Sequence, residues 1–261
     1  MAVKGSVLGD ILGAQYEFDR PKDLDWKNIP LTVGEAIGYT DDTVMTLAIK
    51  KAILTKTELV DTMVSVGREY PFAGYGERFF NWINGNNHEP YNSWGNGSAM
   101  RVSFVGEYYD DYDEMQDMAK TTAMVSHNHP EGVKGAVVTA SCIWMAKHGK
   151  SKQDIYDYVL DQYPKDEYEY SIFYSLDEIR GRYKWTESCM GSVAPAMRCF
   201  YESHDYESFI RNVFSLECDS DTFGAIAGGV AEEFYGGFGE INAEELLGKY
   251  LTQELFDILE M

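Results

Sequence analysis

Apolar residues recur at intervals of three and four along much of the chain, the spacing that places side chains on one face of an α-helix. Alternation of apolar and polar residues, which would indicate strands, is nearly absent. We therefore predict an all-α protein, folded as a compact orthogonal bundle of many helices. The predicted helical segments are residues 4–18, 43–54, 130–149, 206–217, 222–236 and 243–260.

Glycine residues in the first of these segments indicate how it packs. Gly5, Gly9 and Gly13 follow one another at intervals of four, so all three lie on one stripe of the helix. Glycine inside a helix costs about 1 kcal/mol relative to alanine, and a stripe of glycines therefore needs a compensating role. We predict that another helix packs closely against this stripe.

The chain of 261 residues contains no linker-like stretch, repeat or low-complexity segment, which predicts a single domain over residues 1–261. No apolar run approaches the roughly 20 residues of a membrane-spanning helix, so we expect a cytoplasmic protein, most simply a monomer. The four cysteines form no C-x-x-C pair and are expected to be reduced core thiols. The formal net charge of −21 argues against a nucleic-acid partner, because such binding needs Lys and Arg to neutralise phosphates.

Two short acidic segments stand directly before predicted helices, YTDDT at 39–43 and DSDT at 219–222. Ser, Thr and Asp are preferred N-caps, so either segment alone is more typical of a helix cap than of a binding site. However, each carries more carboxylates than a cap uses, and adjacent like charges repel unless a cation neutralises them. The two segments together therefore indicate a divalent cation.

The ligand types in these segments restrict which cation fits. Oxygen ligands without His or Cys favour magnesium, manganese or calcium over zinc. The segments offer more oxygen groups than one octahedral ion needs, since magnesium keeps several waters, so we predict a two-metal site. Because its ligands lie near both ends of the chain, the ends must converge on one point.

A third acidic element lies in the first predicted helix, where Asp10 and Glu17 are seven residues apart. At about 100° per residue, the two side chains return to the same helix face within roughly 20°. Facing inward, they could serve as a metal ligand and an acid or base. Two lone carboxylates are more typical of the protein surface, which is the expectation from these residues alone.

Two further motifs could bind an anionic ligand. The loop SWGNGSAMR at 93–101 offers backbone N–H groups, with Ser98 and Arg101 as additional donors, although Gly-Asn-Gly is equally typical of a tight turn. The segment SHNHPEG at 126–132 places His127 just before a helix that begins at Pro130, for which Asn128 is a candidate N-cap.

Taken in order, six motifs resemble those of the ADP-ribosylglycohydrolase family, from residue 5 to about 236. They are GDILGAQYEF, YTDDT, GNGSAMR, SHNHPEGVKGA, ESCMGSVAPA and DSDTFGAIAGGVAEEFYG. The pair formed by DDT and a distal D-x-D-T is the most specific part. The sequence has Ser126 where the histidine motif of the family often begins with Thr, which keeps the hydroxyl group.

The resemblance implies a central two-metal cleft within the all-α fold, loaded with two Mg²⁺ or Mn²⁺ ions. It assigns metal ligation to Thr40, Asp41, Asp42, Asp219, Asp221 and Thr222, with Asp221 reaching both ions. Glu17 matches a mobile acidic residue of the family. The residues implied to line an ADP-ribose pocket are Asn96, Gly97, Ser98 and His127.

The corresponding hypothesis is hydrolysis of the ribosyl C1″ bond, with Glu17 and Asp41 as the catalytic residues that relay protons. The expected partner is an ADP-ribosylated protein or a small ADP-ribosyl substrate. For a protein substrate, we predict arginine as the modified residue, with serine as the second choice. Three alternatives stay open: a metal-free two-carboxylate glycosidase, an aspartyl-phosphate phosphatase suggested by the DSDT segment, and a non-catalytic ADP-ribose-binding, immunity or structural relative.

Overall fold

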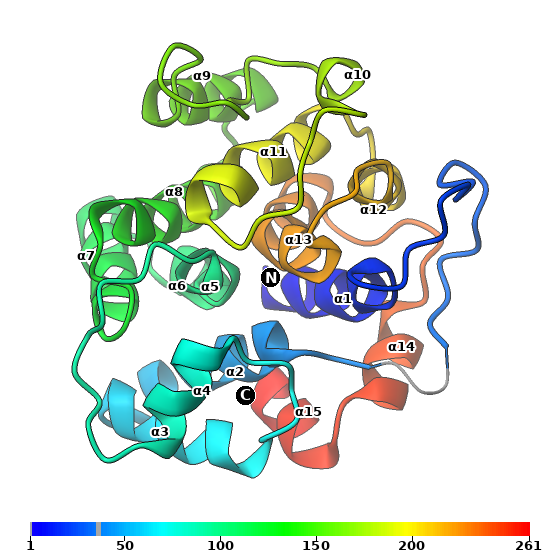
Figure 1. Ribbon diagram of the computed structural model, residues 1–261. Coiled ribbons are helices and arrows are strands. Elements are labelled where there is room, and N and C mark those ends of the chain that lie inside the picture. Colours follow the sequence, from blue (N-terminus) through cyan, green and yellow to red (C-terminus); the bar gives the residue numbers. More distant parts are fainter. Residues whose placement is uncertain (1, 35–37) are drawn as a thin grey trace.

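The computed structural model describes residues 2–34 and 38–261, and the secondary structure within these ranges is helical apart from one isolated bridge between Gly95 and Ser188 (Figure 1). This confirms the predicted all-α class. None of the helices in the described ranges is both long and apolar enough to cross a bilayer. The helices are α1 (Val3–Gly13), the 3₁₀ turn η1 (Ala14–Tyr16), α2 (Asp41–Thr55), α3 (Leu59–Glu69), α4 (Glu77–Asn84), α5 (Gly97–Met100), α6 (Ser103–Tyr108), α7 (Tyr112–Met124), α8 (Pro130–Lys147), α9 (Lys152–Gln162), α10 (Leu176–Ile179), α11 (Cys189–Tyr201), α12 (Tyr206–Phe214), α13 (Ser220–Tyr235), α14 (Ala243–Tyr250) and α15 (Gln253–Glu260).

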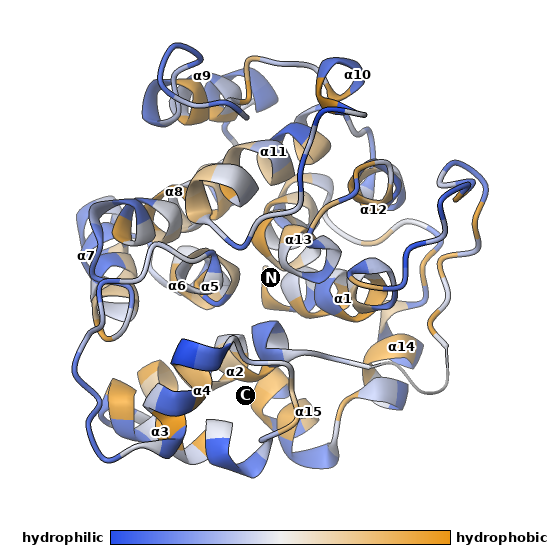
Figure 2. Ribbon diagram, viewed as in Figure 1, coloured by the Kyte–Doolittle hydropathy of each residue, from blue (hydrophilic) through white to orange (hydrophobic). Residues whose placement is uncertain are grey.

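Helices α1 and α13 lie together at the centre of the molecule, although they come from opposite ends of the chain (Figure 1). Nearly all residues of α1 and all of residues 220–232 in α13 are buried. Figure 2 shows both helices largely hydrophobic or neutral in colour, whereas the loop that follows α1 contains hydrophilic stretches. Helices that avoid charge around most of their circumference are typical of a protein centre.

The two central helices touch backbone to backbone along the predicted glycine stripe. A Cβ atom added to Gly9 would lie 2.2 Å from the carbonyl oxygen of Gly224, and one added to Gly5 would lie 2.4 Å from that of Gly228. At Gly13 the added atom would meet the backbone of Ser220 at 2.3 Å. The predicted close helix packing is thus confirmed, and it brings the end of α1 to the start of α13.

Carboxylates from other helices complete the first turn of α1, whose own cap residue makes no side-chain bond. Glu107 of α6 accepts the N–H groups of Ala2 at 2.7 Å and Val3 at 3.0 Å. Glu232 of α13 accepts the N–H of Gly5 at 2.6 Å. These bonds satisfy backbone donors that a helix start leaves without partners and fix α1 against two distant elements.

Three details differ from the prediction. The helix expected over residues 4–18 ends at Gly13 and continues only as a 3₁₀ turn. The segment 243–260 is two helices, because Leu251 is extended and Thr252 caps a new helix by accepting the N–H of Leu255. At α8, the side chain of His129, rather than Asn128, caps the helix by accepting the N–H of Glu131 at 3.1 Å.

Candidate active site

A polar cavity of about 350 Å³ opens where α2 and α13 begin. Its walls come from segments far apart in the sequence, which the contact between α1 and α13 brings together. All but one of the residues expected to bind metal, to catalyse or to line the ADP-ribose pocket do line it, namely Glu17, Thr40, Asp41, Asp42, Asn96, Gly97, His127, Asp219, Asp221 and Thr222. Ser98 does not line it, since its buried hydroxyl donates to the carbonyl of Gly132 at 2.7 Å.

Asp10 is fully buried beneath this cavity, so the expectation of a surface carboxylate is wrong. Its carboxylate accepts the N–H groups of Thr40 and Thr43 at 3.0 and 3.1 Å. It also accepts the hydroxyls of Thr40 at 2.8 Å and Thr43 at 2.5 Å. Asp10 therefore holds the start of α2, and negative charge at a helix N-terminus is itself stabilising.

Glu17 does not share a helix face with Asp10, because α1 ends four residues earlier. Instead, the half-exposed side chain of Glu17 lies at the edge of the cavity. One oxygen from Glu17, one from Asp219 and one from Asp221 lie within 4.8 Å of one another. The chain thus brings these three carboxylates close enough to share a cation.

At the start of α2, Thr40 performs the capping by accepting the N–H of Asp42 at 3.3 Å. The carboxylates of Asp41 and Asp42 are therefore not used for this cap. Asp42 is buried, and its Oδ1 atom has no hydrogen-bond partner. A buried acceptor without a partner is costly, and a ligand would satisfy it.

At the start of α13, Asp219 occupies the N-cap position but makes no capping bond. Its Oδ2 atom accepts the side-chain amide of Asn96 at 2.8 Å. The Thr222 hydroxyl donates to Oδ2 of Asp42 at 3.5 Å and so links the two acidic segments. Capping alone therefore does not explain the second segment.

Burial, together with crowding, raises the pKa values of these carboxylates. Burial, followed by the charges of Asp221 and Asp41, raises the pKa of Glu17 to about 9. Burial and the charges of Asp221 and Asp10 raise the pKa of Asp41 to about 8. Burial and neighbouring carboxylates also place the pKa values of Asp42 and Asp221 well above their usual range. At neutral pH these groups can all be ionised together only if positive charge neutralises them.

The donor set fits a hard divalent cation. The cluster offers carboxylate and hydroxyl oxygens from Glu17, Asp42, Asp219, Asp221 and Thr222, and the free Oδ1 of Asp42 is the orphaned acceptor that a cation would complete. Such oxygens are the ligands of magnesium, manganese and calcium. The presence of two ions stays a prediction.

Without a cation, the stability of the protein is expected to fall as the pH rises from about 5 to about 9. The pKa values of Asp41 and Glu17 are about 8 and about 9 in the fold, against about 4 in an unfolded chain. These carboxyls bind protons more tightly when folded. Their contribution to stability is therefore complete below about pH 4, decreases as the pH rises, and is lost once the pH exceeds the folded pKa values of about 8 and about 9. Thermal unfolding of EDTA-treated protein across this range would measure the effect.

Added Mg²⁺ or Mn²⁺ should restore the lost stability most strongly at high pH, because cations and protons compete for these oxygens. Glu232 lies outside the cavity, and burial raises its pKa to about 8. It therefore also makes the protein less stable as the pH rises. The Glu232→Gln variant is therefore the control, because it removes the part of the pH-dependent loss of stability that a cation cannot restore. A thermal unfolding midpoint that rises with pH in EDTA would contradict this prediction.

His127 is held by a buried chain of hydrogen bonds. Arg101, which is fully buried, donates from Nη2 to the Thr122 carbonyl at 2.9 Å and to the Ser126 hydroxyl at 2.8 Å. The Ser126 oxygen lies 2.8 Å from Nδ1 of His127. Arginine only donates, and among the described residues no other acceptor is found for the buried Ser126 proton. We therefore assign that proton to the bond with Nδ1, which leaves the ring proton of His127 on Nε2.

The imidazole of His127 is neutral, because burial and then the charges of Arg101 and Arg78 hold its pKa well below the usual value. A Cβ added to Gly97 would lie 3.1 Å from Nε2, and one added to Gly95 would lie 3.4 Å from it. The glycine loop therefore leaves room beside a fixed N–H donor of His127.

Some residues that line the cavity were not anticipated. Arg78 of α4 lies over the ring of Tyr91 at 4.7 Å and donates to its carbonyl oxygen at 2.5 Å. Arg101, expected as a donor to a ligand, also lines the cavity. Its guanidinium lies 5.2 Å from the centre of the Phe79 ring, and its Nη1 has no hydrogen-bond partner. The two arginines supply positive charge on the side of the cavity nearest His127.

The fold and the cavity define an all-helical protein with an oxygen-rich acidic site suited to hard divalent cations. A family model described as ADP-ribosylglycohydrolase matches residues 1–237. The chain belongs to the ADP-ribosylglycohydrolase family, a family of glycosyl hydrolases.

Named relatives and a solved structure agree with this membership. The chain is 27% identical to bovine (Bos taurus) ADP-ribosylhydrolase ARH3, with 84% of the chain and 63% of the bovine protein covered. The human (Homo sapiens) protein of the same name is also 27% identical, with 89% of the chain and 84% of the human protein covered. A structure titled "ADP-ribosylglycohydrolase-related protein complex" has a TM-score of 0.74 at 22% identity over 98% of the chain and 96% of its own, which shows the same fold.

Proposed function

We propose that this protein is a metal-dependent hydrolase that cleaves the ribosyl C1″ bond of ADP-ribosylated targets and releases ADP-ribose. The observation that carries the proposal is the convergence of Glu17, Asp219 and Asp221 beside a buried, unpartnered Asp42 oxygen. A non-catalytic relative would have little reason to keep carboxylates whose mutual repulsion destabilises the fold. The phosphatase alternative loses support, because Asp219 follows helix α12 rather than a strand.

In this proposal, Thr40, Asp41, Asp42, Asp219, Asp221 and Thr222 hold two Mg²⁺ or Mn²⁺ ions. When bound, the ions supply positive charge that polarises oxygen ligands and lowers the pKa of water. Asn96 keeps Asp219 oriented through a hydrogen bond from its side-chain amide. The neighbouring loop at Gly97 admits ADP-ribose, and the Nε2–H of His127 donates to an oxygen of that ligand.

Glu17 and Asp41 are proposed to move protons during cleavage. Water adds its oxygen to C1″, the bond to the target breaks, and a carboxyl group delivers a proton to the departing group. Glu17 lies half-exposed at the edge of the cavity and is not among the six proposed ligands, so it suits the role of donor. Asp41 is then the acceptor for the proton of the attacking water.

A substrate panel tests this function. We expect the purified protein to release ADP-ribose from arginine- or serine-linked peptides in Mg²⁺ or Mn²⁺ and not in EDTA. Full activity in EDTA would refute the metal-dependent mechanism and favour a two-carboxylate glycosidase. Stoichiometric metal binding without turnover on any ADP-ribosyl substrate would identify a non-catalytic relative.

Loss of the Ser126 hydroxyl is expected to weaken substrate binding. Ser126→Ala removes the group that joins Arg101 to His127, so we expect KM to rise about tenfold with a smaller change in kcat. Ser126→Thr retains a hydroxyl and should restore KM. Nitrogen-15 NMR of the imidazole should show Nδ1 of His127 as the unprotonated nitrogen in the parent chain and a mixture in Ser126→Ala. An unchanged tautomer and KM would contradict the assigned hydrogen-bond chain.

A further inference from the structure

The segment ESCMGS at 187–192, which leads into helix α11, holds the glycine loop in place. The backbone N–H of Asn96 donates to the carbonyl of Glu187 at 2.7 Å. The N–H of Cys189 in turn donates to the carbonyl of Trp94 at 3.0 Å. These two backbone bonds run in opposite directions between the segments, so they fix the position of the loop beside the acidic cavity.

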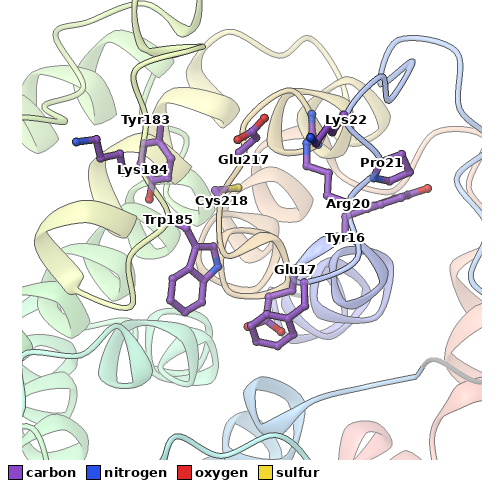
Figure 3. A pocket seen from close by; sticks show the side chains of 11 residues that line it. Tyr16, Glu17, Arg20, Pro21, Lys22, Tyr183, Lys184, Trp185, Glu217 and Cys218 are labelled. Atoms are coloured by element: carbon purple, nitrogen blue, oxygen red, sulfur yellow. The ribbon is translucent and has the colours of Figure 1, made fainter.

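The chain just before this segment contributes to two hollows. Residues 183–185 line a pocket of about 720 Å³ together with residues 16–22 (Figure 3). Glu187, only two residues further on, lines the acidic cavity. The part of this stretch that belongs to the acidic site is therefore the one that begins at Glu187.

The side chain of Asn96 is oriented by two acceptors. Asn96 stands at the N-cap position of α5 but makes no capping bond there. Its Nδ2 atom instead donates to Oδ2 of Asp219 at 2.8 Å and to the Ser192 hydroxyl at 3.1 Å. An amide nitrogen has two protons and an ionised carboxylate only accepts, so both amide protons are used and the nitrogen must face Asp219.

The Ser192 hydroxyl is placed to accept the proton of this amide. It is fully buried and donates its own proton to the carbonyl of Thr186 at 3.4 Å, which leaves its oxygen free for Asn96. Thr186 can come this close to the first turn of α11 because residue 191 is glycine. A Cβ atom added to Gly191 would lie 2.3 Å from the side chain of Thr186.

We propose that Ser192 is a positioning residue of the enzyme, which fixes the rotation of the Asp219 carboxylate through the Asn96 amide and so sets the affinity for the divalent cation. The proposal rests on the proposed metal-dependent function. Groups that hydrogen-bond to a metal-binding side chain orient it, and their loss costs about 10- to 100-fold in metal affinity or activity. Ser192 is not among the residues that line the cavity, so it acts only through Asn96.

Metal binding is tested first, by calorimetric titration of the whole chain with Mn²⁺. We expect Asn96→Ala to weaken Mn²⁺ binding about 10- to 100-fold and Ser192→Ala to weaken it about tenfold. In the double variant, Ser192→Ala should add nothing to the effect of Asn96→Ala, because the hydroxyl acts through that amide. Unchanged affinity in Ser192→Ala, or losses that add in the double variant, would overturn the proposal.

Ser141→Ala is the matched control for this substitution. Ser141 is also fully buried, and its hydroxyl accepts a hydrogen bond from Tyr112 at 3.2 Å. We expect Ser141→Ala and Ser192→Ala to lose similar stability toward urea, whereas only Ser192→Ala loses Mn²⁺ affinity. An equal loss of Mn²⁺ affinity in both variants would show a general effect of buried hydroxyls and overturn the positioning role.

Hydrolysis separates this role from the proposed function. In Ser192→Ala, the Mn²⁺ concentration that gives half the maximal rate should rise about tenfold, and kcat at saturating Mn²⁺ should fall by much less. Turnover by the parent chain together with an unchanged Mn²⁺ requirement in Ser192→Ala would overturn the positioning role and leave the hydrolase function intact. Weaker Mn²⁺ binding by Ser192→Ala, in a parent chain that cleaves no ADP-ribosyl substrate, would refute the hydrolase function alone. A parent chain that binds no Mn²⁺ would refute both.

Discussion

Asp221→Asn is expected to lower kcat about a thousandfold or more, because stabilisation of charge by a bound cation is worth several kcal/mol. Asp221 is central to the cluster: its charge contributes to the raised pKa values of Glu17, Asp41 and Asp42. Removing that charge should weaken cation binding and lower the pKa of Glu17. ADP-ribose release in Mg²⁺ and in Mn²⁺, together with metal binding by calorimetry, would measure both effects.

The same variant is expected to be more stable than the parent chain in EDTA at pH 8, since one of the repelling carboxylates is gone. This combination of lost activity and gained metal-free stability separates a ligand from a residue that only supports the fold. Asp161→Asn, at an exposed position on α9, is the matched control and should change neither property. An Asp221→Asn enzyme with ordinary turnover would disprove the proposed ligand role.

Gly9→Ala is expected to destabilise the protein by at least about 3 kcal/mol, or to prevent folding altogether. The added methyl would lie 2.2 Å from the carbonyl oxygen of Gly224, and both partners are backbone of buried helices that cannot turn aside. The free energy of unfolding in urea would measure the loss. Because the contact brings α13 to α1, metal affinity should fall in any folded fraction.

Gly248→Ala provides the comparison for this substitution. Gly248 lies in α14, and an added Cβ there would have no atom within 4 Å. Alanine favours helix over glycine by about 1 kcal/mol, so this variant should be as stable as the parent or slightly more stable. Equal stability of Gly9→Ala and the parent chain would show that the two central helices do not touch as described.

The helical class and the close packing of α1 were predictable, because apolar spacing and a glycine stripe are local patterns with few structural solutions. The acidic segments at Asp41 and Asp221 could be recognised for a similar reason, as each has more carboxylate than a helix cap uses. The role of Asp10 could not be read in this way. Helix α1 is buried on nearly all sides and so has no polar face. Without such a face, the sequence does not show whether the Asp10 side chain points into the protein or toward solvent.

Other parts of the site depend on tertiary contacts that no local pattern encodes. The direction of Glu17 depends on where α1 stops, and the sequence continues a helix-like spacing past Gly13. Arg78 reaches the cavity only because α4 packs near Tyr91. The Ser98 hydroxyl is taken by the Gly132 carbonyl, a partner 34 residues away.

The way α1 is completed has a consequence for the synthesis of this protein. The Gly5 N–H is accepted by Glu232, 227 residues later, and the glycine stripe has no partner until α13 exists. At 5 to 20 residues per second, a ribosome needs roughly 10 to 50 s to supply that helix. During this interval α1 is an apolar segment outside the exit tunnel without its native contacts. Newly made chains should therefore depend on chaperones until α13 has been translated.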